Sequence, residues 1–233
     1  MSAGMSAGPS TPMVRTRVKI CGVRTPEVAG HAAACGADMI GFVFVAGSPR
    51  EIEPSAAAAI LTSVPPGVTC VGVIRDRTAD GFYEAVEGCP CELWQPHGSE
   101  TDAVLAEYGG GLVRGLKFDA ETLDRELDRF GAHGAVDAVL VDGSGGGEGT
   151  AFDWARLASA IERTGFAKPV FLAGGLTAAN VGEAIAAVRP WAVDVSSGVE
   201  SSPGEKDPGE IEAFCRAVRE ADAGGPGSGI GVE

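Results

Sequence analysis

The chain has 233 residues, of which 45% are hydrophobic, and its formal net charge is −14. This length and apolar content suit one sizeable core, such as a single eightfold α/β barrel, whereas the acidic balance argues against nucleic acid or an anionic membrane as a partner. An anionic substrate would have to be bound by local donors, because the overall field repels it.

The six cysteines are not paired at the spacing of a zinc site. Cys89 and Cys91 are separated by one residue and have no histidine at ligand spacing, so we expect them to pack rather than to bind metal. The sequence shows no apolar run of transmembrane length, and its first residues lack the pattern of a signal peptide. We therefore expect a cytoplasmic protein with reduced thiols, no metal and no redox cofactor.

Short apolar runs alternate with helical patterns at intervals of about 20–30 residues, between a predicted disordered leader (residues 1–12) and a glycine-rich tail (residues 223–233). The predicted strands are Val14–Ile20, Met39–Phe44, Val68–Ile74, Glu92–Gln95, Leu112–Phe118, Ala138–Asp142, Val170–Ala173 and Ala192–Ser196. The predicted helices are Pro26–Cys35, Pro54–Val64, Thr78–Val86, Glu100–Tyr108, Ala120–Phe130, Asp153–Arg163, Ala178–Val188 and Asp207–Ala221. The fourth strand is the weakest of these, because Trp94-Gln95-Pro96 is unusual in a buried strand.

Near-continuous apolar strands that alternate with helices are typical of a parallel sheet covered on both faces. Eight such units suit closure into a (β/α)8 TIM barrel over residues 13–222, which leaves no free sheet edge. An open, doubly wound sheet is the alternative, but no Gly-x-Gly-x-x-Gly motif follows the first strand. We therefore predict an α/β fold with one eight-stranded barrel.

The residues that follow the strands are the candidates for function, because chemistry in such barrels gathers at the carboxyl ends of the strands. The first strand leads to Cys21, whose thiol could exchange a proton, attack, or simply fill the core. The sixth ends in Asp142, which we expect to be partly desolvated and able to hold a proton for general-acid use; a turn or capping aspartate is the alternative. Arg50 after the second strand could clamp a carboxylate or be a solvated charge. His97 after the fourth could be a base, a hydrogen-bond donor or incidental.

Glycine-rich segments follow the last three strands. The loop at residues 143–149 resembles a mobile lid, since no lysine closes it as in a nucleotide-binding loop. The pair Gly174 and Gly175 follows the seventh strand, and Ser196, Ser197 and Gly198 follow the eighth. Barrels often bind phosphate between these two loops. A thiol, a carboxylate and an anion cradle together predict acid–base chemistry on a sugar phosphate.

In this order, the strand ends resemble those of the phosphoribosylanthranilate isomerase family of tryptophan biosynthesis. The resemblance extends from Arg17 to Val218 and is carried by Lys19–Gly22, Gly41–Phe44, Ser48–Arg50, Gln95, His97–Gly98, Asp142 with the glycine loop, Phe152–Trp154, Ala173–Leu176, Asn180–Val181 and Val193–Glu200. Pro96 departs from the family, whose members commonly carry an apolar residue there, and we expect it to end the fourth strand early.

The resemblance implies an Amadori rearrangement, in which N-(5-phosphoribosyl)anthranilate becomes 1-(2-carboxyphenylamino)-1-deoxyribulose 5-phosphate without a cofactor. It implies that Asp142 protonates the ring oxygen of the ribose and that Cys21 then removes the proton from C2. A free thiol has a pKa of about 8.5 and is mostly protonated at neutral pH, so we expect the pKa of Cys21 to be shifted down.

The resemblance also implies binding roles. Arg50 would hold the anthranilate carboxylate, Asp194 would face the anthranilate amine, and Gln95 and His97 would line the mouth of the barrel. The phosphate would be held by Gly174, Gly175, Ser196, Ser197 and Gly198.

Two alternatives compete with this assignment. The related isomerases of histidine biosynthesis usually carry carboxylates at both catalytic strand ends, which Cys21 argues against. A catalytically idle barrel that binds phosphosugars or a partner enzyme is the other, and the presence of both Cys21 and Asp142 argues against it. The expected partner is the small-molecule substrate, and both a monomer and a homodimer remain open.

Overall fold

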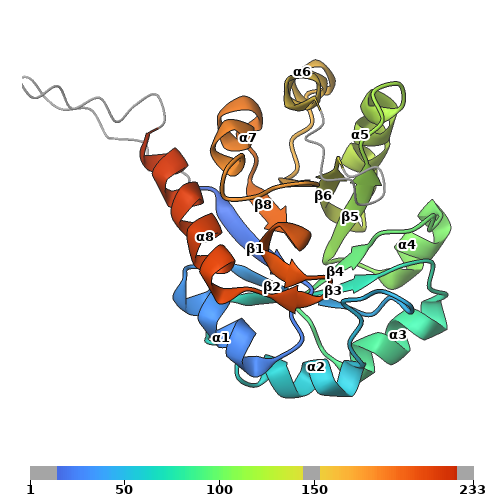
Figure 1. The fold of residues 1–233 in the computed structure, drawn as a ribbon. Helices are drawn as coiled ribbons and strands as arrows, with labels where there is room; N and C mark the ends of the chain where they lie inside the picture. Colours follow the sequence, from blue (N-terminus) through green and yellow to red (C-terminus); the bar gives the residue numbers. More distant parts are fainter. Residues whose placement is uncertain (1–14, 144–152, 225–233) are drawn as a thin grey trace, which may run out of the picture.

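A computed structural model describes residues 15–143 and 153–224 of the chain. Within them, eight parallel strands form a closed barrel in chain order, and the last strand pairs with the first. Figure 1 shows the helices arranged around these strands. The predicted (β/α)8 TIM barrel is therefore confirmed. The predicted leader, and residues 225–233 of the predicted tail, lie outside the described residues.

The strands and helices follow one another in strict alternation. The barrel strands are β1 (Arg17–Cys21), β2 (Met39–Val43), β3 (Thr69–Ile74), β4 (Leu93–Pro96), β5 (Leu112–Lys117), β6 (Val136–Asp142), β7 (Val170–Ala173) and β8 (Ala192–Val195). The helices are α1 (Pro26–Ala34), α2 (Pro54–Leu61), α3 (Ala79–Gly88), α4 (Asp102–Tyr108), α5 (Leu123–Ala132), α6 (Trp154–Thr164), α7 (Val181–Val188) and α8 (Pro208–Ala223).

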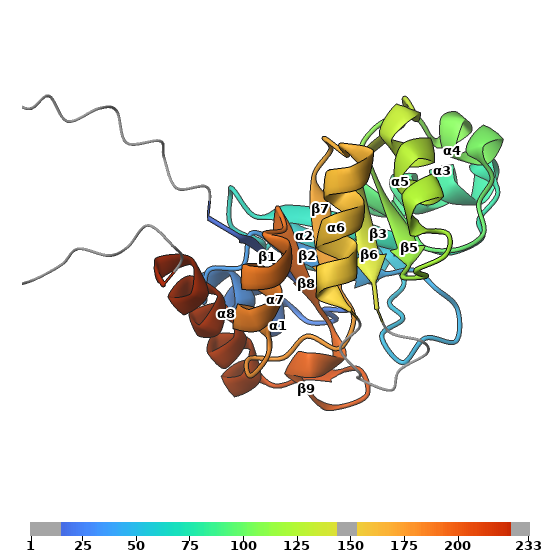
Figure 2. The ribbon, with the colours of Figure 1, turned by 90° about the horizontal axis from the view of Figure 1, so that it is seen from above.

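The segment between β8 and α8 contains structure that the sequence did not predict. It forms a short 3-10 helix, η1 (Ser197–Val199), and an antiparallel pair of strands, β9 (Glu200–Ser202) and β10 (Glu205–Lys206). Figure 2 shows β9 at one end of the barrel. The stretch was missed because strands of three and two residues are too short to show an apolar alternation.

The expectation that Pro96 would end the fourth strand early is wrong, because β4 includes this residue. Pro96 is the last residue of β4 and pairs with Ile74 of β3. A proline is tolerated at such a position because its missing N–H is not needed where the ladder ends. Its carbonyl still accepts a hydrogen bond, from Arg114 Nη1 at 3.0 Å.

Side chains along each strand alternate between two apolar layers. On β6, Val139 and Val141 belong to the large layer that includes the helices, whereas Leu140 belongs to the interior of the barrel. The interior layer is formed by Met39, Val71, Val113, Ala138, Leu140, Phe171, Ala173 and Ala192. The same alternation decides which residues at the strand ends face the mouth of the barrel.

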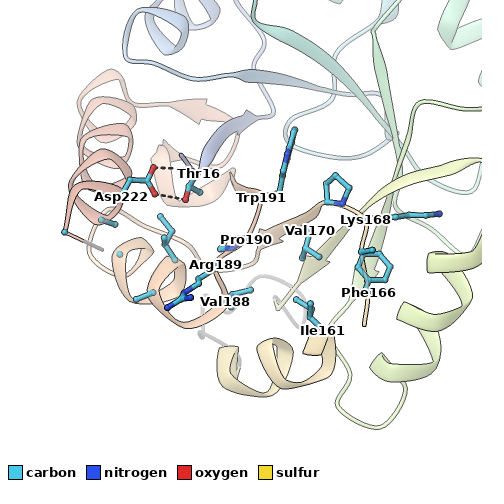
Figure 3. A pocket seen from close by; sticks show the side chains of 17 residues that line it. Thr16, Ile161, Phe166, Lys168, Val170, Val188, Arg189, Pro190, Trp191 and Asp222 are labelled. Carbon is cyan, nitrogen blue, oxygen red and sulfur yellow. Dashed lines mark hydrogen bonds between the residues drawn. The ribbon is translucent and has the colours of Figure 1, made fainter. Parts of the chain in front are cut away.

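A pocket of about 1160 Å³ lies at the amino-terminal end of the barrel (Figure 3). Its lining includes Thr16, which precedes β1, and Trp191, which precedes β8. The N–H and hydroxyl of Thr16 donate to the carboxylate of Asp222 on α8, at 2.9 and 2.8 Å. Because these residues lie before their strands, the pocket is at the opposite end of the barrel from Cys21 and Asp142.

A buried ion pair anchors the loop that follows β4. Arg114 of β5 donates to Glu100 at 2.7 Å and to the carbonyl of Gly98 at 2.6 Å. Glu100 in turn accepts from the N–H of Gly98 at 2.9 Å. Both side chains are almost fully buried, so each charge depends on the other for compensation. The pair thereby holds the loop that carries His97.

We expect Arg114→Met to lower the free energy of unfolding by about 3–5 kcal/mol, because it leaves the Glu100 carboxylate buried without a partner. Urea denaturation followed by circular dichroism measures this loss. Arg125→Met is the matched control, since the ion pair of Arg125 with Glu126 is solvent-exposed on the arginine side and such pairs contribute about 0–1 kcal/mol. Equal losses in the two variants would contradict the role of the buried pair.

Candidate active site

Strand alternation directs one thiol and two charged groups of β1 and β8 into the mouth of the barrel. On β1, Val18 and Ile20 belong to the outer apolar layer, so Lys19 and Cys21 face inward. On β8, the valines on either side of Asp194 also belong to the outer layer. The predicted placement of Cys21 and Asp194 at the mouth therefore agrees with the geometry.

Cys21 is buried at the end of β1, where it packs with Val43 of β2 and Val73 of β3. Burial raises the pKa of the Cys21 thiol, and the positive charges of Lys19 and Lys206 only partly oppose this effect. The predicted downward shift is therefore wrong in direction. The physical reason is desolvation, which favours the neutral thiol over the thiolate.

Lys19 is a site residue that the sequence analysis missed. Its side chain is fully buried, and its Nζ donates to Asp194 Oδ1 at 2.7 Å. Burial alone would lower the pKa of Lys19, but Asp194 and Cys21 raise it, so the side chain remains an ammonium. The available signal was a charge between the apolar residues Val18 and Ile20, two positions before Cys21 and thus on the same face of the strand.

Asp142 and His97 meet at the mouth from β6 and from the loop after β4. His97 Nε2 lies 3.7 Å from Asp142 Oδ2, and both side chains remain about one quarter exposed. The Gln95 amide, buried on β4, donates to His97 Nδ1 at 3.1 Å. Burial lowers the pKa of His97 although Asp142 and Asp194 raise it, which favours a neutral imidazole at neutral pH. The structure thus brings together Asp142, His97 and Gln95.

Arg50 is paired with a residue of its own chain that the sequence analysis had not assigned. Its Nε and Nη2 donate to Glu200 Oε1 and Oε2, each at 2.8 Å, in a bidentate pair. The hydrogen bonds with Glu200 raise the pKa of Arg50. The view of Arg50 as a solvated loop charge is therefore wrong. Glu200 also accepts from Lys206 Nζ at 2.6 Å.

Lys206 of β10 extends this network to the loop after β8. Its ammonium donates to the carbonyl of Ser196 at 2.9 Å and to the Ser196 hydroxyl at 3.3 Å. The Ser196 hydroxyl donates in turn to the carbonyl of Cys21 at 3.0 Å. Ser196, one residue of the predicted phosphate cradle, is thereby connected to both the β9–β10 pair and the end of β1.

The loops after β7 and β8 approach each other closely. Gly174 and Gly175 have φ angles of +93° and +64°, which other residues rarely adopt. At Gly198, a Cβ would lie 1.9 Å from the carbonyl oxygen of Leu176, so only glycine allows this contact. The Asn180 side chain donates to the carbonyl of Gly175 at 2.9 Å. Closely spaced glycine backbones next to helix starts are suited to binding an anion through N–H groups.

The remaining predictions concern the lid, a metal site, the pair of Cys89 and Cys91, and a membrane-spanning segment. Residues 144–152, which contain most of the predicted lid, lie outside the described residues. Among those described, no three histidine, cysteine, aspartate or glutamate side chains come together as a metal site would require. Cys89 and Cys91 are both buried, with their sulfur atoms 3.8 Å apart. No helix within residues 15–143 and 153–224 is both long and apolar enough to cross a membrane.

The fold and the site together define a class of protein. A closed (β/α)8 barrel presents a buried thiol and a carboxylate at its carboxyl-terminal mouth, beside two glycine-containing loops. This combination is characteristic of barrel enzymes that use acid–base chemistry on small phosphorylated substrates.

Comparison with known proteins identifies the family within this class. Residues 18–217 match the profile of the family described as PRAI, N-(5′phosphoribosyl)anthranilate (PRA) isomerase. The N-(5′-phosphoribosyl)anthranilate isomerase of Pseudomonas putida strain W619 is 45% identical over 211 residues, which cover 90% of this chain and 100% of that protein. The chain therefore belongs to the N-(5′-phosphoribosyl)anthranilate isomerase family and is an isomerase of tryptophan biosynthesis.

Solved structures agree with this placement. The crystal structure of phosphoribosyl anthranilate isomerase from Thermotoga maritima has a TM-score of 0.78 and 33% identity, covering 88% of this chain and 99% of that one. The structure of the Thermus thermophilus enzyme has a TM-score of 0.77 and 35% identity over the same shares. A further isomerase structure, with a TM-score of 0.76 and 32% identity over 88% of this chain and 99% of that one, was solved in complex with reduced 1-(o-carboxyphenylamino)-1-deoxyribulose 5-phosphate.

We expect Gly198→Ala to raise KM for the phosphoribosyl substrate by roughly 10-fold or more, equivalent to about 1.4 kcal/mol of binding. The added methyl group would collide with the carbonyl of Leu176 and displace the loop after β8. Steady-state kinetics measures the effect. Gly30→Ala on α1 is the control, because a Cβ there meets no atom within 4 Å. An unchanged KM in Gly198→Ala would exclude this loop from substrate binding.

Proposed function

We propose that Cys21 is the general base and Asp142 the general acid of the isomerase, acting on N-(5-phosphoribosyl)anthranilate. The observation that carries this proposal is their placement at the carboxyl ends of β1 and β6, on different sides of one barrel mouth. A proton can thus be delivered to one side of a bound sugar and removed from another.

The reaction then follows in three steps. Asp142 gives its proton to the furanose oxygen, and the bond between that oxygen and C1 breaks as the anthranilate nitrogen forms an iminium. The Cys21 thiolate removes the proton from C2, and the electron pair of that C–H bond forms an enolamine. The enolamine gains a proton at C1 and loses the hydroxyl proton at C2, which yields the ketone of 1-(2-carboxyphenylamino)-1-deoxyribulose 5-phosphate. No cofactor takes part in these steps.

The binding roles follow from the same geometry. We propose that the substrate carboxylate pairs with Arg50 through the guanidinium edge formed by Nη1 and Nη2, because Glu200 occupies the edge formed by Nε and Nη2. Asp194 would face the anthranilate amine, and Gln95 would orient His97 toward the substrate. The phosphate would lie between the loops after β7 and β8, on Gly174, Gly175, Ser196, Ser197 and Gly198.

We further propose that the enzyme is cytoplasmic and forms a homodimer. A cytoplasmic location is supported by the six cysteines, all of which are free thiols. One similar structure is described as that of monomers generated from the dimeric isomerase of Thermotoga maritima. The dimeric state of that relative supports a homodimer over a monomer here. Nucleic acid is not expected as a partner, because the net charge is −14.

We expect Cys21→Ser to lower kcat by at least roughly 10²-fold, because a serine hydroxyl is a far weaker base than a thiolate. Since burial raises the pKa of Cys21 and the base must be deprotonated, wild-type kcat/KM should rise as the pH increases above neutrality. Cys35→Ser, at the end of α1, is the matched control and should retain full activity. Retention of wild-type kcat by Cys21→Ser would show that another group removes the C2 proton.

We expect Asp142→Asn to lower kcat by at least roughly 10²-fold with a much smaller change in KM, because the amide keeps the shape of the carboxyl group but cannot supply its proton. Steady-state kinetics separates the two constants. Asp137→Asn changes the same residue type at the other end of β6 and should leave kcat unchanged. If Asp142→Asn keeps near-normal kcat, the proton comes from elsewhere, and His97→Gln then tests the neighbouring imidazole.

A further inference from the structure

Lys19 is a buried charge that the proposed mechanism does not use. Its side chain has no solvent exposure, and it lies on the inward face of β1, two positions before Cys21. A lysine is almost never fully buried without a specific partner, and the partner here is Asp194 of β8. The position of this ammonium, directly next to the proposed base, needs an explanation beyond the packing of β1.

The backbone of β2 leaves room for the lysine and the thiol to approach each other. Gly41 pairs with Cys21 in the register between β1 and β2. A Cβ on Gly41 would lie 2.9 Å from the Cys21 sulfur and 3.2 Å from Cε of Lys19. Both side chains therefore reach toward the same small space, which a larger residue at position 41 would fill.

The register between β1 and β8 holds the ammonium in place. Lys19 and Asp194 are paired positions of these two strands, and the 2.7 Å hydrogen bond between their side chains fixes Nζ on the β8 side of Cys21. Asp194 thus compensates the buried charge. It also raises the pKa of Lys19, as Cys21 does, against the opposite effect of burial, which keeps the lysine protonated.

Several other charged groups face Cys21 from the surrounding elements. Burial has the largest effect and raises the pKa of the thiol, and the carboxylate of Asp194 raises it as well. The ammonium groups of Lys19 and of Lys206 on β10 lower this pKa, and the effect of Lys19 is the larger of the two. Arg50, after β2, also interacts electrostatically with Cys21. On the far side of the mouth, the His97 imidazole and the Asp142 carboxylate interact with each other, and His97 also interacts with both Lys19 and Asp194.

We propose that Lys19 is a positioning residue that stabilises the thiolate of Cys21, with Asp194 holding its ammonium next to the sulfur. This inference rests on the proposed role of Cys21 as the base. When the thiolate takes the C2 proton of the substrate, the thiol becomes neutral and Lys19 keeps its own proton and its bond to Asp194. Lys19 therefore changes the energy of the base without exchanging a proton with the substrate.

The test is the pH dependence of Cys21 alkylation by iodoacetamide, because only the thiolate reacts. The rate is measured by mass spectrometry of the peptide that contains Cys21, in wild type and in Lys19→Met. An opposite charge at close range shifts a pKa by about 1–3 units, so the alkylation profile of Lys19→Met should move to higher pH by that amount. The profile of kcat/KM should move with it.

Lys168→Met is the matched control for loss of a lysine. Lys168 donates to the carbonyls of Phe130, His133 and Val136, near the amino-terminal end of the barrel and away from Cys21. This variant should lose thermal stability but keep the wild-type alkylation profile. If Lys19 served folding alone, its replacement would leave the pKa of Cys21 unchanged. An unchanged alkylation profile in folded Lys19→Met therefore overturns the inference.

A second variant covers the case in which Lys19→Met does not fold because Asp194 is left without its partner. Lys19→Met/Asp194→Asn removes both charges of this pair at once, so neither is left buried without its partner. Since Lys19 affects the Cys21 thiol more strongly than Asp194 does, the profile should still move to higher pH, by less. A shift to lower pH, or none, contradicts the inference.

The outcomes for Lys19 and for the proposed base are separable. If Cys21→Ser abolishes turnover while Lys19→Met keeps the wild-type alkylation profile, the base is correct and the role of Lys19 is wrong. If Cys21→Ser keeps turnover but Lys19→Met shifts the profile, the coupling between the two side chains is real and the proposed function of Cys21 is wrong.

Discussion

The ion pair between Lys19 and Asp194 joins the first and last strands of the barrel at the seam where the sheet closes. Both charges are removed from solvent, so loss of either partner would leave the other uncompensated. The pair also constrains the register of β1 against β8. A shift by one residue would turn Lys19 away from Asp194 and toward the apolar layer under the helices.

The base of the proposed reaction depends on this arrangement. Cys21 follows Lys19 on the same face of β1, and Gly41 leaves the space in which the two side chains approach. Burial protects the thiol and at the same time disfavours its ionised form. A buried thiol can serve as a base only if nearby positive charge offsets part of the cost of ionising it. In the proposed mechanism, the ammonium of Lys19, held by Asp194, supplies this charge.

A second polar network connects the parts of the mouth that would bind the two ends of the substrate. Glu200 accepts hydrogen bonds from Arg50 and Lys206, and Lys206 donates to Ser196. The proposed carboxylate clamp and the proposed phosphate cradle are thus held by one set of partly buried hydrogen bonds. Such networks confer rigidity when all members are satisfied, and rigidity keeps the reacting atoms aligned. The β9–β10 pair supplies the residues that make this connection.

The sequence by itself determined the eight strand–helix units and the placement of Cys21, Asp142 and the two glycine loops at strand ends, because apolar periodicity and turn residues are local properties. Only the tertiary structure decided which charges meet: Lys19 pairs with a residue 175 positions away and Arg50 with one 150 positions away. It also reversed the expected direction of the Cys21 pKa shift. Desolvation and Coulomb interactions depend on distances through space, and these distances exist only once the strands have closed into a barrel.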